Sequence, residues 1–114
     1  MSICVYKNDN PEHFRQAMDS ILNQIVIPDE IVLVIDGPIP ISTNNIIQLY
    51  GNDPNIKVVR LSQNVGHENA RRIGLEHCTY DLVALMDADD ISLPDRFEKQ
   101  IKCFEADEAL RRFI

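Results

Sequence analysis

The chain is poor in positive charge, and this shortage removes one large class of partner. Its 114 residues include 11 Lys and Arg against 18 Asp and Glu, which gives a net charge of −7 at pH 7. A nucleic-acid-binding domain normally carries a basic face, so the charge balance predicts no nucleic-acid partner. The same acidity is compatible with a protein that holds cations or metal-bound phosphates.

Cysteine pairs and long apolar runs are also missing. The three cysteines, Cys4, Cys78 and Cys103, are widely spaced and form no CxxC pair, so neither a zinc site nor a disulfide framework is indicated. A reduced, cytosolic setting is the simplest interpretation. No apolar run approaches the roughly 20 residues that span a bilayer, and no secretory signal pattern is visible at the start of the chain.

The composition does provide a core. Apolar residues make up 45% of the sequence, and the length is typical of one domain, so we expect residues 1–114 to form a single domain. Short apolar runs that predict strands alternate with segments of helical spacing. The predicted strands are 2–6, 31–35, 56–60 and 82–86, and the predicted helices are 11–25, 42–50, 67–77 and 92–104, with 105–114 as helix continuation or a tail.

Capping signals support several of these helices. Asn10 or Asp9 precedes a proline at the first helical position, Ser42 or Thr43 is suited to cap the second helix, and Ser92 is suited to cap the fourth. The resulting order, β-α-β-α-β-α-β-α, predicts an α/β fold. Such a fold has a mostly parallel sheet with helices on both faces, which makes a Rossmann-like three-layer α/β/α sandwich.

Carboxylates follow two of the predicted strands. Asp36 follows the second strand, and Asp87, Asp89 and Asp90 come directly after the fourth. Ligands of open parallel sheets bind at the carboxyl ends of the strands, so these acids are expected at one rim. Packed carboxylates raise one another's pKa unless a cation lies among them. The pattern therefore predicts a divalent metal, Mg²⁺ or Mn²⁺, held together with substrate phosphates.

An ordered series of segments, taken together, resembles the family 2 glycosyltransferases, which bind nucleotide sugars with a GT-A fold. The resemblance runs from residue 2 to about residue 104, almost the whole chain. Any one segment is a weak signal, whereas the full series in the right order is strong. The segments are 2–8, 17–24, 30–37, 64–66, 70–75, 85–90 and 94–100.

The resemblance implies a site for a nucleoside-diphosphate sugar, UDP-linked or other. Asp36 would bind the base or the ribose, and Arg71 would reach the base or the diphosphate. Asp89 is implied as the metal ligand, with Asp87 near the ribose or the metal and Asp90 as a third acid. The implied substrate-binding residues are Tyr6, Asp36, Asn64, Gly66, Arg71 and Asp87, and the implied metal ligands are Asp89 and Asp87.

Asp87 and Asp89 match the family's DxD segment, and family members continue past it into strands that bind the acceptor and supply a catalytic base. No residue of this chain is assigned that role, so we expect the donor-binding half, truncated after the DxD segment relative to the family. The resemblance implies sugar transfer with inversion to a glycan or lipid-linked acceptor in surface polysaccharide synthesis. The implied location is cytoplasmic, peripheral at the inner face of the membrane.

Three alternatives stay open at this point. A haloacid-dehalogenase-type phosphatase also places DxD after an apolar strand, but that strand is the first of its domain. A receiver-like domain has an acidic metal pocket but needs paired acids after its first strand, where Asp9 is single. A non-catalytic fragment would self-associate to cover an exposed sheet edge. His67 is interpreted as a surface or turn residue.

Overall fold

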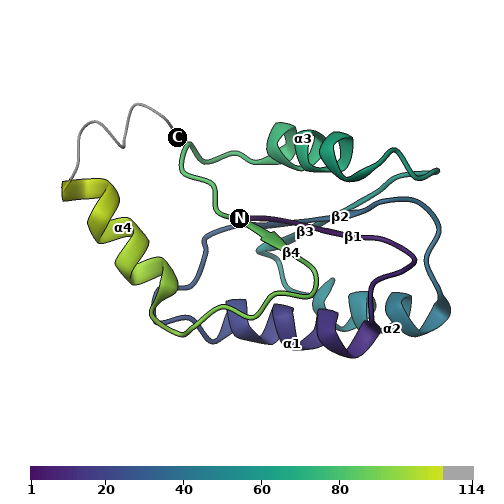
Figure 1. The fold of residues 1–114 in the computed structure, drawn as a ribbon, viewed down its shortest axis with the longest axis horizontal. Coiled ribbons are helices and arrows are strands. Elements are labelled where there is room, and N and C mark those ends of the chain that lie inside the picture. Colours follow the sequence, from purple (N-terminus) through teal and green to yellow (C-terminus); the bar gives the residue numbers. More distant parts are fainter. Residues whose placement is uncertain (107–114) are drawn as a thin grey trace.

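The computed structural model describes residues 1–106, and strands alternate with helices along the whole of that range (Figure 1). The strands are β1 (Ser2–Val5), β2 (Ile31–Ile35), β3 (Ile56–Arg60) and β4 (Leu85–Asp87). The helices are α1 (Pro11–Leu22), α2 (Ile41–Tyr50), α3 (His67–His77) and α4 (Arg96–Ala106). The predicted element order is confirmed. The helix continuation or tail predicted for 105–114 lies, from residue 107 on, outside the described residues.

The four strands form one parallel sheet in the order β3-β2-β1-β4. After β1 the chain adds β2 and then β3 on one side, and β4 returns to pair with β1 on the other side. The strand order therefore reverses between β1 and β4. Open parallel sheets bind ligands in the crevice at such a switch point, outside the carboxyl ends of the strands. Here those ends include Cys4 and Asp87, which are paired in the register.

The sheet lies between two helical layers, with α1 and α2 on one face and α3 on the other (Figure 1). Because side chains alternate along a strand, β2 sends Leu33 into the larger core beneath α1 and α2. Val32 and Val34 pack on the other face against Ala70 of α3. Every residue of β2 is buried, as expected for a strand covered on both faces. The predicted three-layer α/β/α architecture is confirmed.

Helix α3 lies directly against the sheet because Gly74 leaves room for it. A Cβ atom at Gly74 would lie 2.2 Å from the Oγ of Ser2 and 3.1 Å from a methyl group of Val34. Ala70, one turn earlier, is fully buried against the same face. Because α3 is held this close to the sheet, its first turn lies at the carboxyl edge of the sheet. Within residues 1–106, the helices are all too short or too polar to cross a membrane.

Helix α1 begins as its sequence predicts and ends earlier. The Oδ1 of Asn10 accepts hydrogen bonds from the backbone N–H groups of Glu12 and His13, at 2.9 and 3.1 Å. Asn10, and not Asp9, is therefore the cap. The helix ends at Leu22, and Ile25, which was predicted to continue the apolar stripe, is 64% exposed.

Strand β4 is shorter than the predicted strand 82–86. In the parallel register Ser2, the first residue of β1, pairs with Leu85, the first residue of β4. Strand β1 has no earlier strand residue with which 82–84 could pair. One backbone hydrogen bond, from Ser2 to the carbonyl of Ala84 at 2.9 Å, continues the contact. The point at which the neighbouring strand β1 begins thus limits the length of β4.

Two predicted helix caps are wrong. Helix α2 begins directly after Pro40, whose backbone is extended, so neither Ser42 nor Thr43 occupies the capping position. Helix α4 begins at Arg96, four residues after Ser92. The hydroxyl of Ser92 instead accepts a hydrogen bond of 3.0 Å from the guanidinium of Arg96. That contact ties the loop after β4 to the start of α4.

Candidate functional site

A cavity of about 440 Å³ opens at the carboxyl ends of β1 and β4, at the switch point of the sheet. Most of the residues predicted for the donor site line it, from four separate stretches of the chain. Arg71 is not among the lining residues, but its side chain reaches the cavity's Asp87 from α3. The lining residues are Cys4, Val5, Tyr6, Asp9, Asp36, Asn64, Gly66, His67, Asp87, Ala88 and Asp89.

The three acids after β4 come together. A carboxylate oxygen from each of Asp87, Asp89 and Asp90 lies within 4.8 Å of the other two. A turn brings this about, since the backbone N–H of Asp90 donates to the carbonyl of Asp87 at 3.1 Å. Clustered carboxylate oxygens are the donor set that Mg²⁺ and Mn²⁺ prefer. The residues present therefore fit the divalent cation that the sequence predicts.

Asp9 also lines this cavity; the sequence indicated for it a possible helix cap or the single acid of a receiver-like pocket. Its Oδ2 accepts a hydrogen bond of 2.9 Å from the backbone N–H of Tyr6. Burial raises the pKa of Asp9, and the negative charges of Asp89 and Asp87 add to that rise, against the lowering effect of the Tyr6 hydrogen bond. The loop after β1 therefore adds negative charge to a site that already has an excess of it.

The turn after β2 forms the opposite wall. Asp36 is only 5% exposed, and its Oδ1 accepts a hydrogen bond of 2.8 Å from the backbone N–H of Val65. The Asn64 amide donates to the Asp36 carbonyl at 3.3 Å, while its own oxygen accepts from Gly66 at 3.2 Å. Gly37 has a φ of +87°, and a Cβ there would lie 2.6 Å from the Asn64 nitrogen. The predicted residues Asp36, Asn64 and Gly66 thus form one interlocked wall.

His67 is exposed, as the sequence predicts for a surface residue, and it also lines the cavity. It is the first residue of α3, and its Nε2 lies 2.9 Å from Nη2 of Arg71 and 3.4 Å from Oδ1 of Asp87. Nη2 of Arg71 also lies 3.4 Å from the same Asp87 oxygen. The available signal was the four-residue spacing of His67 and Arg71, which puts both side chains on one helix face.

Cys4 also lines the cavity, and its thiol is disfavoured in the ionised form. Burial raises the pKa of its thiol to about 11, and the nearby Arg71 only partly opposes this. At neutral pH the sulfur therefore stays protonated, whereas nucleophilic cysteines act as thiolates.

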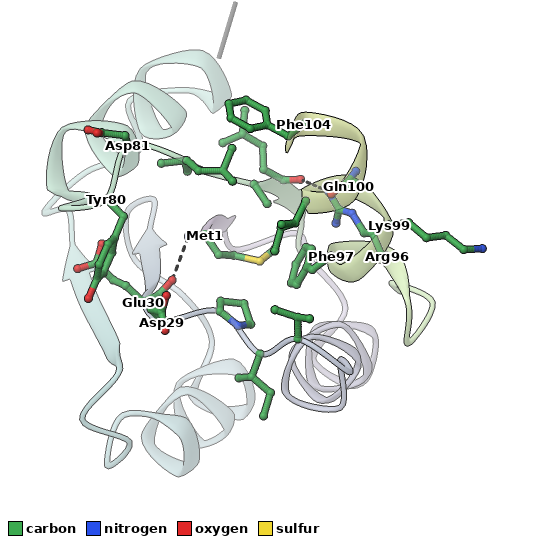
Figure 2. Close-up of a pocket in the computed structure, with 18 of the residues that line it drawn as sticks. Met1, Asp29, Glu30, Tyr80, Asp81, Arg96, Phe97, Lys99, Gln100 and Phe104 are labelled. Atoms are coloured by element: carbon green, nitrogen blue, oxygen red, sulfur yellow. Dashed lines mark hydrogen bonds between the residues drawn. The ribbon is translucent and has the colours of Figure 1, made fainter. Parts of the chain in front are cut away.

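A second cavity, of about 730 Å³, lies at the other end of the sheet, between the amino ends of the strands and α4 (Figure 2). Its walls are mainly apolar, with Phe97 and Phe104 of α4 facing it. Arg96 donates to the carbonyl of Leu85 at 3.1 Å across this space. The larger cavity lies away from the switch point and from the clustered acids, so the smaller cavity is the candidate site.

Known proteins match this chain over nearly its full length. The model of the family described as Glycosyl transferase family 2 matches residues 2–110. The amylovoran biosynthesis glycosyltransferase AmsE of Erwinia amylovora is 42% identical over 104 residues, which cover 91% of this chain and 39% of that protein. An Escherichia coli UDP-Gal:alpha-D-GlcNAc-diphosphoundecaprenol beta-1,3-galactosyltransferase is 35% identical over 96 residues, covering 84% and 35%. The chain thus spans less than half the length of these relatives.

Solved structures share the fold at lower identity. S. aureus TarS 1-349 in complex with UDP-GlcNAc aligns with a TM-score of 0.77 and 23% identity over 92% of this chain and 31% of that one. The mannosyltransferase PcManGT from Pyrobaculum calidifontis, in complex with GDP-Man and Mn²⁺, aligns with a TM-score of 0.76 and 21% identity over 94% and 32%. Both likenesses concern the fold, and the GT-A-like architecture predicted from the sequence is confirmed. The match over residues 2–110 shows that the chain belongs to glycosyl transferase family 2.

Proposed function

We propose that this chain is the donor-binding part of an inverting glycosyltransferase and that it binds a nucleoside-diphosphate sugar together with Mg²⁺ or Mn²⁺. One observation carries the proposal. Three carboxylates lie within 4.8 Å of one another at the switch point, and Arg71 reaches one of them, Asp87, from the neighbouring helix. Acids for a cation beside a guanidinium for phosphate are the groups that a metal-bound diphosphate requires.

Each wall of the cavity has a part in this proposal. Asp36, Asn64, Gly66 and Tyr6, which all line the cavity, bind the base and ribose. Asp89 and Asp87 hold the cation, and the planar donors of Arg71 face the diphosphate. When bound, the cation would neutralise the diphosphate leaving group as the glycosidic bond breaks. The acceptor-activating base stays unassigned among the residues of this chain.

The names of relatives and neighbours suggest the substrates. The E. coli relative is named for UDP-Gal and a diphosphoundecaprenol acceptor, and the TarS neighbour was solved with UDP-GlcNAc. We therefore favour a UDP-sugar, with a GDP-sugar second, and a glycan or lipid-linked acceptor in surface polysaccharide synthesis. The location that fits such an acceptor is cytoplasmic and peripheral at the inner face of the membrane. No nucleic-acid partner is proposed.

The alternatives from the sequence are less well supported. The DxD segment follows β4, not the first strand as in the phosphatases, and the receiver-like reading needs a second acid beside Asp9. Self-association stays a prediction: β4 pairs with β1 along one edge, and Leu85 on it is partly exposed. A non-catalytic role for this chain is compatible with donor binding.

Calorimetric titration with nucleotides tests the proposal on the chain itself. We expect UDP, or failing that GDP, to bind in the presence of Mn²⁺ and to bind much more weakly once EDTA removes the metal. Uridine, which lacks the diphosphate, should show little metal dependence. The absence of binding by UDP, GDP and their sugars, with Mn²⁺ present, would contradict the proposal.

A further inference from the structure

The guanidinium of Arg71 lies between two acceptors, and this placement has a consequence for the diphosphate. Its terminal nitrogen Nη2 lies 2.9 Å from Nε2 of His67 and 3.4 Å from Oδ1 of Asp87. An arginine side chain has donors and no acceptor, and each terminal nitrogen carries two hydrogens. One hydrogen therefore points to the imidazole and the other to the carboxylate. Arg71 joins His67 on its own helix to the acid at the end of β4.

The same chemistry assigns the proton of His67. Because Arg71 can only donate, Nε2 of His67 must offer a lone pair, and in the neutral imidazole the proton is then on Nδ1. The 3.4 Å approach of Nε2 to Asp87 is in that state a contact between two acceptors. In that state the Arg71 guanidinium, which contacts both atoms, holds the two acceptors near each other. The shorter of the two distances is the one to His67.

We propose that His67 is a positioning residue that holds the Arg71 guanidinium partly away from Asp87. Arginine and a carboxylate otherwise tend to close into a two-bond, fork-like ion pair. That closed pair would occupy Asp87, a proposed cation ligand, and the Arg71 donors that face the diphosphate. With Nη2 shared with the imidazole, Asp87 stays available to the cation and the remaining donors of Arg71 to the phosphate. The inference rests on the proposed function of the site.

The test compares two replacements of His67 with a matched histidine on the same helix. His67→Ala removes the acceptor, and we expect it to weaken Mn²⁺-dependent UDP binding about tenfold, as supporting contacts of metal sites commonly do. His67→Gln keeps a side-chain oxygen that can accept from Arg71, and it should restore most of the affinity. His77→Ala, at the far end of α3, should leave the affinity unchanged. Uridine binding should not respond to His67→Ala, because uridine has no diphosphate.

The outcomes separate this inference from the proposed function. UDP affinity of the His67→Ala chain equal to that of the unchanged chain overturns the role of His67 alone. Equal losses for UDP and uridine also overturn it, since they indicate a general structural effect. If the unchanged chain binds no nucleotide, both proposals fall. Nitrogen-detected NMR of the ¹⁵N-labelled imidazole is independent of nucleotide: the proton of neutral His67 is expected on Nδ1, and a proton on Nε2 contradicts the inference.

Discussion

Asp89→Asn is expected to weaken the Mn²⁺-dependent binding of UDP at least about tenfold, with no loss of the folded state. The exchange keeps the size of the side chain and one oxygen but removes the negative charge that a divalent cation needs. Asp89 lies in the exposed loop after β4, so little packing changes. The affinity is read by calorimetry with and without EDTA, and the fold by circular dichroism.

The matched comparison uses two other aspartates, each of which loses the same single charge. Asp81→Asn, in the wall of the larger cavity, should leave the UDP affinity unchanged. Asp90→Asn should give a smaller loss than Asp89→Asn, because we assign the ligand role to Asp89 and Asp87. Equal losses for all three variants would mean that UDP responds only to the overall charge of the protein, which would contradict a metal site at Asp89.

Gly37→Ala is expected to lower the free energy of unfolding by about 2 kcal/mol or more. The φ of +87° at Gly37 is one that a residue with a side chain rarely adopts. In addition, the new Cβ would lie 2.6 Å from the backbone nitrogen of Asn64, which cannot rotate away as a flexible side chain could. Because Asn64 belongs to the cavity wall, nucleotide binding should weaken as well. Urea unfolding gives the free energy.

Substitutions at two other glycines separate the cost of backbone strain from the cost of the steric clash. Gly66 has a φ of +91° and a ψ of 157° but no atom within 4 Å of a new Cβ, so Gly66→Ala should cost only the backbone strain, about 1–3 kcal/mol. Gly51 has a φ of −66°, and its new Cβ would lie 3.3 Å from the nearest atom, so Gly51→Ala should change the stability by less than about 1 kcal/mol. A Gly37→Ala chain as stable as the Gly51→Ala chain would contradict the interlocked wall.

The sequence predicts most of the fold because local patterns and the final packing agree. The run 31–35 is apolar throughout, and it forms the fully buried strand β2. Asn10 followed by a proline predicts the start of α1, where both the capping oxygen and the ring are found. These signals depend on neighbours in the chain, which a sequence displays directly.

Other features depend on partners that the sequence does not display. The length of β4 follows from the point at which β1 begins, since Ser2 pairs with Leu85. Ser92 has the residue type of a helix cap, but its hydroxyl contacts Arg96 and the sulfur of Met86. No local pattern ranks these distant partners above the capping position.

The candidate site likewise has features that the sequence predicts and features that it does not. Carboxylates after an apolar strand predicted the acid cluster, because parallel strands deliver their carboxyl ends to one rim. Predicting the contribution of His67 requires the strand order. That order puts β4 beside β1 and so brings Asp87 close to the first turn of α3. Predicting Asp9 at the site requires the turn after β1, where its carboxylate accepts a hydrogen bond from the backbone N–H of Tyr6. The roles that we propose for Asp36 and Arg71 come from the family resemblance and not from the residue pattern alone.

Amide NMR of the ¹⁵N-labelled chain with UDP and a small amount of Mn²⁺ tests the central claim most directly, because the paramagnetic ion broadens the signals of the amides nearest to it. We predict that broadening begins at residues 87–90, extends to Asp9 and His67, and reaches residues 80–82 beside the larger cavity last. We also predict that this broadening requires the carboxylate of Asp89. Broadening that begins at Asp29, Glu30 or Asp81, or that spreads evenly over the exposed acids, would contradict a metal–diphosphate site at the carboxyl ends of β1 and β4.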